Sequence, residues 1–255
     1  MKVVILAGGL GSRIREETVS KPKPMIEIGN MPILWHIMQI YSQYGFNEFV
    51  IALGYKGETI KQFFLNYFYI RNNLTISLTD GKIKVHDGSK ENWNIHLVDT
   101  GLKTQTGGRL KKLADWIGNE TFMMTYGDGL SNVNIDELLK THKRNGKLAT
   151  VTAVRPPSRF GGLEIQGEKV NHFTEKPQIG EGWINGGFFV LEPEVLRYID
   201  DELTPFEKTP LERLAEDNQL AVHCHDGFWQ CMDTLRDLEI LESFWSKGEV
   251  PWQKK

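Results

Sequence analysis

The sequence is poor in cysteine, and it lacks both a long apolar run and a marked excess of charge. Cys224 and Cys231 are its two cysteines, too few for a disulfide framework in 255 residues. No apolar run reaches the ~18 residues of a membrane-spanning helix, and a strand-like run follows Lys2 directly, without a signal peptide. The formal net charge is -3, so no overall field attracts nucleic acid or an anionic membrane. We expect a cytoplasmic protein with no nucleic-acid partner and no membrane partner.

Hydrophobic residues make up 40% of the chain and charged residues 25%, as in an ordinary globular protein. Short apolar runs alternate with segments whose apolar residues recur at helical spacing. The expected strands are Lys2–Ala7, Glu48–Leu53, Ile95–Asp99, Thr121–Tyr126, Ala149–Val154 and Ile184–Leu191. The expected helices are Pro32–Tyr44, Lys56–Tyr67, Gly107–Ile117, Ile135–Asn145, Leu211–Asp217 and Asp237–Trp245. This alternation predicts an α/β fold, a Rossmann-like doubly wound and mostly parallel mixed sheet with helices on both faces.

Two segments interrupt the alternation. Leu163–Ile165 and Val170–Glu175 flank Gly167 and predict a hairpin. Leu74–Asn92 has little periodicity, and it is either a smaller β excursion or a contact between subunits. We expect one domain over residues 1–255, with the segment from about Pro156 onward continuing the same fold.

A glycine-rich loop, Gly8-Gly9-Leu10-Gly11-Ser12-Arg13, follows the first expected strand. Its spacing matches neither the P-loop nor the dinucleotide fingerprint, which disfavours an NAD-dependent oxidoreductase. The glycines alone fit a tight turn equally well. Arg13 and Lys23 add fixed positive charge over the same spot, and backbone N–H groups at such a turn approach an anion closely. Together they indicate a polyphosphate site.

Two aspartates stand on separate elements, one of them at an expected strand end. Asp128 lies in the Gly127-Asp128-Gly129 turn, and Asp233 precedes the last expected helix. Either one could simply cap a helix. In open α/β sheets, however, ligands bind at the carboxyl ends of the strands. A pair of hard oxygen ligands beside a polyphosphate site suits Mg²⁺.

The motifs resemble those of the sugar-1-phosphate nucleotidyltransferases. Residues 8–38 are similar to the family signature, with Ser12 for its Thr and Ile14 for its Leu. Four further stretches are similar to the metal-binding turn, the EKP motif, the N-x-G strand and the W-x-D motif, the last stretched by one residue. These stretches are Thr125–Gly129, Glu175–Pro177, Ile184–Phe188 and Trp229–Thr234.

The resemblance implies Mg²⁺-dependent nucleotidyl transfer to a sugar 1-phosphate by direct in-line displacement. Arg15–Thr18, Thr106–Lys111 and Phe228–Asp237 are most similar to members that use CTP and glucose 1-phosphate. It therefore implies formation of CDP-glucose and diphosphate, which supplies surface polysaccharides such as O-antigen lipopolysaccharide. The same reaction with UTP, dTTP or GTP remains an alternative, as does a nucleotide-sugar sensor without turnover. Relatives form tetramers or hexamers, which implies a homo-oligomer.

The resemblance also assigns roles to residues, with the nucleotide in about residues 1–155 and the sugar in about 156–255. Arg13 and Lys23 are the implied catalytic cations, with Lys21 as a nearby rival of Lys23. The implied metal ligands are Asp128 and Asp233. The residues implied to bind the nucleotide are Leu6, Ala7, Gly8, Gly9, Gly11, Ser12, Arg13, Lys23, Thr106, Gly107, Arg109, Gly127 and Asp128. The residues implied to bind the sugar phosphate are Glu175, Lys176, Asn185 and Gly186. Arg109 fits a surface position on a helix as well.

Overall fold

The computed structural model describes residues 1–86, 88, 91–156, 162–166, 169–174 and 182–254, with the backbone alone for 162–166 and 169–174. The strands are β1 Val3–Leu6, β2 Glu27–Ile28, β3 Met31–Pro32, β4 Glu48–Leu53, β5 Asn73–Ile76, β6 Ile83–His86, β7 Asn94–Asp99, β8 Phe122–Tyr126, β9 Gly129–Ser131, β10 Ala149–Val154, β11 Gly162–Gln166, β12 Lys169–Thr174, β13 Ile184–Leu191, β14 Leu220–His225 and β15 Trp229–Cys231. The α-helices are α1 Arg15–Thr18, α2 Ile33–Ser42, α3 Gly57–Ile70, α4 Thr106–Lys112, α5 Ala114–Ile117, α6 Ile135–Asn145, α7 Thr209–Glu216 and α8 Leu235–Ser246. Three 3₁₀ turns are η1 Ser12–Ile14, η2 Lys23–Met25 and η3 Pro193–Tyr198.

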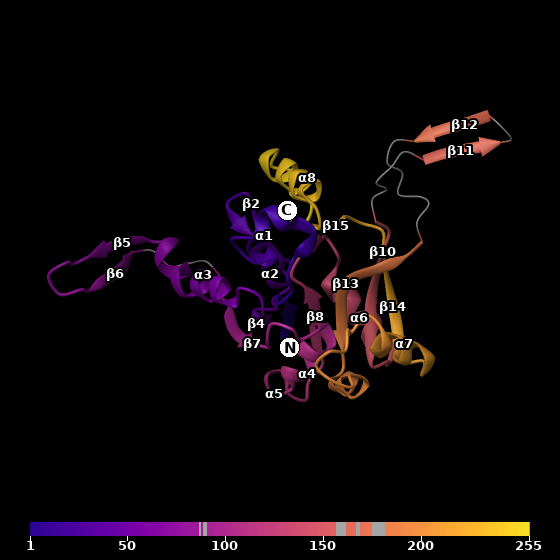
Figure 1. Ribbon diagram of the computed structural model, residues 1–255, viewed down its shortest axis with the longest axis horizontal. Helices are drawn as coiled ribbons and strands as arrows, with labels where there is room; N and C mark the ends of the chain where they lie inside the picture. Colours follow the sequence, from indigo (N-terminus) through magenta and orange to yellow (C-terminus); the bar gives the residue numbers. More distant parts are fainter. Residues whose placement is uncertain (87, 89–90, 157–161, 167–168, 175–181, 255) are drawn as a thin grey trace.

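Seven strands form the central sheet in the order β14-β10-β13-β8-β1-β4-β7. β1 runs parallel to β4 and β8, β4 runs parallel to β7, and β10 runs parallel to β14. β13 is antiparallel to both of its neighbours, β8 and β10. The expected mostly parallel mixed sheet is confirmed, and Figure 1 shows this sheet in the body of the molecule.

Helices cover both faces of the sheet, as expected. Alternate residues of β1 point to opposite faces because side chains in a strand alternate. Val3 and Ile5 belong to a core cluster with α2, α6 and α8, whereas Val4 and Leu6 pack in a second cluster with α4, α5 and η3. Apolar burial on two sides explains why β1 carries no polar residue.

An arm leaves the body on the β4 side. It consists of α3 and the antiparallel β5–β6 hairpin, and Figure 1 shows it extending away from the sheet. Within α3 only Gly57 and Ile60 are buried. The hairpin confirms the expected β excursion within Leu74–Asn92. Among the described residues, no helix combines the length and apolar character needed to cross a membrane.

Candidate active site

The carboxyl ends of β1, β4, β7 and β8 meet at one edge of the sheet, because these strands run parallel. The glycine-rich loop leaves β1 there, and the Gly127-Asp128 turn leaves β8. Asn185 reaches the same edge from the amino end of antiparallel β13, opposite Ala153 of β10. The fold therefore gathers the described residues of both predicted halves of the site at one edge.

Gly11 gives the glycine-rich loop its shape. Its φ of 64° lies in the left-handed region, and a Cβ there would lie 2.7 Å from the Thr18 Cγ2 atom. Thr18 Oγ1 also donates hydrogen bonds to the carbonyl oxygens of Gly11 and Ile14, at 3.2 and 3.1 Å. These contacts fix the path of the chain at the start of η1, which contains Ser12 and Arg13.

Asp128 and Asp233 come together through a short antiparallel ladder between β9 and β15. In this ladder Cys231 pairs with Gly129, and the Met232 N–H donates to the Asp128 carbonyl oxygen at 2.9 Å. Asp128 and Asp233 both lie at the end of the ladder where Gly129 pairs with Cys231. The pairing therefore brings two carboxylates together from segments about a hundred positions apart.

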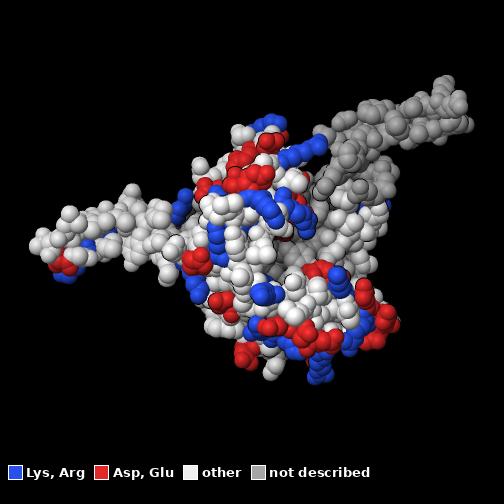
Figure 2. All heavy atoms as spheres, in the orientation of Figure 1, with Lys and Arg blue, Asp and Glu red and all other residues white. Residues whose placement is uncertain are grey.

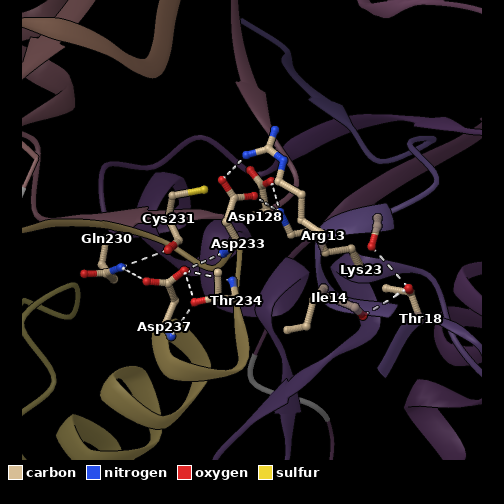
Figure 3. A network of polar contacts seen from close by, with 11 residues as sticks. Arg13, Ile14, Thr18, Lys23, Asp128, Gln230, Cys231, Asp233, Thr234 and Asp237 are labelled. Atoms are coloured by element: carbon tan, nitrogen blue, oxygen red, sulfur yellow. Dashed lines mark hydrogen bonds and ion pairs between the residues drawn. The ribbon is translucent and has the colours of Figure 1, made fainter. Parts of the chain in front are cut away.

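Lys23 joins the two carboxylates. Its ammonium donates to Asp128 Oδ2 and to Asp233 Oδ1, both at 2.6 Å, and Arg13 pairs with the other oxygen of Asp233 (Figure 3). Lys23 is 9% exposed, and Pro24 beside it packs against Gly127. Lys21 instead lies 3.9 Å from Glu17. Lys23, and not its predicted rival, thus reaches the aspartates.

The charges in this cluster offset one another. Burial lowers the pKa of Lys23, but the charge of Asp128 and hydrogen bonds to both aspartates outweigh burial and leave that pKa above its usual value. Burial alone would raise the pKa of Asp233, yet Lys23 and Arg13 hold it below its ordinary value. The shifts of both pKa values favour the charged forms of Lys23 and Asp233. Such a cluster can exchange its internal pairs for a divalent cation and a polyphosphate.

A cap at the start of α8 holds the segment that carries Asp233. Thr234, and not Asp233, is the N-cap, and it forms a capping box with Asp237. Asp237 Oδ2 accepts hydrogen bonds from the backbone N–H groups of Asp233 and Thr234, at 3.0 and 2.8 Å. Asp233 thus keeps its carboxylate free for Lys23 and Arg13, and the cap alternative is wrong for it.

Arg109 lies beneath the glycine-rich loop. Its guanidinium donates to the carbonyl oxygens of Gly8, Leu53 and Gly101, each at 2.9 Å, and to Thr100 Oγ1 at 2.6 Å. These four acceptors belong to the loops or ends of β1, β4 and β7, so one side chain ties three neighbouring strand exits together. Arg109 is 4% exposed, which rules out the surface alternative. Its predicted contact with the nucleotide remains a prediction.

The other predicted nucleotide residues surround this edge. Leu6 and Ala7 are buried at the end of β1, whereas Gly9 is exposed. Gly107 packs against the Thr204 carbonyl, where a Cβ would come within 2.6 Å. The structure brings the described members of this predicted set to the sheet edge or to the layer beneath it.

Glu207 lies among these residues but was not predicted from the sequence. Its carboxylate accepts hydrogen bonds from Thr106 Oγ1 and from the Tyr126 hydroxyl, both at 2.6 Å. Burial, and next the charge of Glu207, raise the pKa of Tyr126. Glu207 follows η3 in a segment without a recognisable motif, so no local signal marks it.

The sugar side is described in part. Asn185 Oδ1 accepts from the Gly187 N–H at 2.8 Å, and Trp229 Nε1 donates to the Gly186 carbonyl at 2.8 Å. Trp229 therefore holds the strand segment that carries Asn185 and Gly186, two of the predicted sugar residues. Glu175 and Lys176 lie outside the described residues. The hairpin expected around Gly167 is confirmed by the β11–β12 pairing.

The sequence model of the family described as Nucleotidyl transferase matches residues 2–246. The chain belongs to this family. A glucose-1-phosphate cytidylyltransferase of Salmonella typhi is 50% identical over 254 residues, which cover 99% of each chain. The family membership expected from the motifs is confirmed.

Solved structures show the same fold at low identity. HddC from Yersinia pseudotuberculosis superposes with a TM-score of 0.69 at 21% identity, over 96% of this chain and 99% of the other. The inositol-1-phosphate CTP transferase from T. maritima gives 0.67 at 14% identity, over 98% and 95%. The α/β fold of this nucleotidyl transferase is thus shared with proteins of distant sequence.

Proposed function

We propose that the chain transfers a cytidylyl group from CTP to α-D-glucose 1-phosphate and releases diphosphate. The observation that carries the proposal is the 50% identity to a glucose-1-phosphate cytidylyltransferase over 99% of both chains. A sugar-phosphate oxygen forms a bond to the α-phosphorus of CTP, the bond between the α-phosphorus and its bridging oxygen to the β-phosphate breaks, and CDP-glucose and diphosphate result.

The acidic pair suits Mg²⁺. Two carboxylate oxygens, from Asp128 and Asp233, converge on one ammonium at 2.6 Å each, so they are close enough to share one small cation. Bound there, Mg²⁺ would neutralise charge on the reacting phosphates. Aspartates and cations of this kind are the ordinary means of nucleotidyl transfer, which depends on positioning and charge neutralisation.

Lys23 and Arg13 also contact the triphosphate during the reaction. Both pair with the carboxylates, and both can turn to phosphate oxygens when a dication takes over the aspartates. Arg13 is suited to this because its side chain is 75% exposed. Its forked donors then hold the triphosphate, while Lys23 offsets the charge that develops at the α-phosphorus. As the motif implies, Lys176 contacts the sugar phosphate and Glu175 accepts hydrogen bonds from the glucose hydroxyls.

A grid assay tests this function. Diphosphate release is measured with Mg²⁺ for CTP, UTP, dTTP and GTP, each combined with several hexose 1-phosphates. We expect the highest kcat/KM for CTP with glucose 1-phosphate, and CDP-glucose in the mass spectrum of the products. A higher value for another nucleotide would assign a different base. Tight nucleotide-sugar binding without release from any pair would favour the sensor.

We further propose that the arm joins copies of this chain into a homo-oligomer, a tetramer or hexamer. It exposes large apolar side chains on both α3 and the hairpin, among them Leu65 at 73%, Ile70 at 76% and Leu78 at 96%. Figure 2 shows an arm with few charged residues beside a body dotted with both signs. Exposed apolar area of this extent marks an interaction surface.

Sedimentation velocity tests the assembly. We expect Leu78→Asp, or Leu65→Asp, to convert the oligomer to smaller species, because a charge replaces an apolar contact. Leu203→Asp is the matched control, since Leu203 is 60% exposed on the body. A wild-type monomer, or an unchanged oligomer in both arm variants, would contradict the proposal.

We also propose a cytoplasmic location, which the two free thiols fit.

A further inference from the structure

Cys231 places a thiol beside the two aspartates. Its Sγ atom and one carboxylate oxygen each from Asp128 and Asp233 lie within 4.8 Å of one another. Figure 3 shows the sulfur atom on the side of the cluster that faces the carboxylates. Nothing in the nucleotidyl transfer proposed above uses this thiol.

The donor set differs from one built for Mg²⁺ alone. Mg²⁺ takes oxygen ligands, whereas a thiolate selects softer cations such as Zn²⁺ and Cd²⁺. One sulfur and two carboxylate oxygens supply three protein ligands, and water or substrate can take the fourth position of a tetrahedral zinc ion. The geometry therefore supports a second class of cation at the same place.

We propose that Asp128, Cys231 and Asp233 bind a thiophilic divalent cation of the zinc and cadmium class, which competes with Mg²⁺. The inference rests on the proposed function in one respect, namely that these aspartates hold the dication of the reaction. On binding, the S–H bond of Cys231 breaks, a sulfur–metal bond forms and one proton passes to solvent. No electrons are transferred.

The surroundings stabilise this arrangement. The β9–β15 ladder fixes the backbone of Cys231 opposite Gly129, and the Asp237 cap fixes Asp233. The ligand set is therefore ordered before a cation binds.

The second cysteine provides a matched control. Cys224 is exposed on β14, at the outer edge of the sheet. A cation that bound thiols without a built site would prefer this accessible residue. Replacing each cysteine in turn therefore separates the proposed site from adventitious thiol binding.

Cadmium titration gives a direct readout that needs no turnover. The cadmium–thiolate bond has an ultraviolet charge-transfer absorption, which we expect to saturate at one ion per chain in Cys224→Ser and to be absent in Cys231→Ser and Cys231→Ala. In the Cys224→Ser background, Asp128→Asn and Asp233→Asn should weaken cadmium binding at least about tenfold. Circular dichroism confirms that each variant is folded. An absorption band that persists without Cys231 would overturn the proposal. So would a cadmium affinity that neither aspartate substitution changes.

Zinc inhibition supplies the second readout. Turnover at fixed Mg²⁺ is measured against rising Zn²⁺ and expressed relative to the zinc-free rate of each variant. We expect Cys231→Ser to need at least about tenfold more zinc for half-inhibition than wild type, and Cys224→Ser to behave like wild type. Equal sensitivity of Cys231→Ser and wild type would contradict the inference. Wild-type turnover with Mg²⁺ tests the proposed function separately, because the cadmium absorption band does not depend on turnover.

Discussion

Asp233 is the residue on which the ion pairs of the site meet, since it accepts from both Lys23 and Arg13. We expect Asp233→Asn to lower kcat/KM about 100-fold or more, because an amide holds a dication weakly and leaves the cations unbalanced. Asp128→Asn should act in the same direction. Diphosphate release measures the effect.

The matched control for these variants is Asp115→Asn, an exposed aspartate on α5. It should leave both the rate and the circular dichroism spectrum unchanged. Near-normal turnover in Asp233→Asn or Asp128→Asn would reject the two aspartates as the metal pair.

His36 couples stability to pH. Its Nε2 contacts the Ile28 carbonyl at 2.8 Å, and Trp252 Nε1 donates to its Nδ1 at 3.3 Å. These partners require a neutral ring with one donor and one acceptor nitrogen. Burial, the largest cause, lowers the pKa of His36 from 6.5 to about 4.

We therefore expect stability to fall as the pH drops from 6.5 to about 4. In that window His36 is protonated in the unfolded state but stays neutral in the folded state. The free energy of unfolding therefore falls by about 1.4 kcal/mol per pH unit. Urea unfolding at several pH values measures the slope, and His36→Gln should flatten it relative to wild type. Parallel slopes for His36→Gln and wild type would refute the assignment.

Among the elements, the start of α8 links helix capping to the site. Asp237 accepts from the backbone of both Asp233 and Thr234, and Gln230 Nε2 donates to its other oxygen at 3.1 Å. We expect Asp237→Ala to lower the free energy of unfolding by about 1–2 kcal/mol. It should also reduce kcat, because Asp233 loses its support.

Asp237→Asn, which keeps one acceptor oxygen, should recover part of the rate lost in Asp237→Ala. The control is Asp136→Ala in the first turn of α6, a helix that is capped instead by Asn134. Urea unfolding and diphosphate release give the two readouts. A normal rate together with reduced stability would limit Asp237 to a role in the fold.

The elements also show what periodicity can and cannot predict. The predicted bounds of α6, β10 and β13 are those observed. The two strands are mostly buried runs, and α6 is an amphipathic helix that begins at the Asn134 cap and ends at Gly146. Residues 107–117 were expected as one helix, but the structure has α4 and α5 with a break at Leu113. The break falls at a leucine and not at a glycine or proline, so the sequence carries no local signal for it.

The ladder that assembles the site was equally hidden. β9 and β15 have three residues each and pair across about a hundred positions, too short and too distant for a periodic signal. The motif resemblance pointed to Asp128 and Asp233, but only the pairing explains their closeness. The contacts of Arg109 and Glu207 with distant backbone and hydroxyl groups depend on the tertiary structure in the same way.

On the scale of the whole molecule, the two predicted halves share one sheet. β13 from the second half lies between β8 and β10, which both come from the first. Trp252 packs in the same core cluster as Val3 and Ile5 of β1. This interleaving favours the single domain over 1–255, which remains a prediction, because removing either half would leave unpaired strands.

We accordingly expect one cooperative unfolding transition. Tryptophan fluorescence and far-ultraviolet circular dichroism should give coincident denaturation curves at a fixed protein concentration. A fragment of residues 1–155 should fail to fold, since β10 has lost the strand that joins it to β8. Separate transitions, or a stably folded fragment, would divide the chain into two domains.

The guanidinium beneath the glycine-rich loop has an evolutionary consequence. A Cβ at Gly8 or Gly54 would fall 2.2 or 2.6 Å from Arg109 Nη1, so the three positions share one small volume. A descendant that gains a side chain at position 8 has to displace or lose the arginine, and one that loses the arginine no longer needs glycine at position 8. Position 54 still needs its glycine, because a Cβ there would also lie 2.6 Å from the Gly8 carbonyl oxygen. Substitutions at positions 8 and 109 should therefore co-vary across divergent lineages.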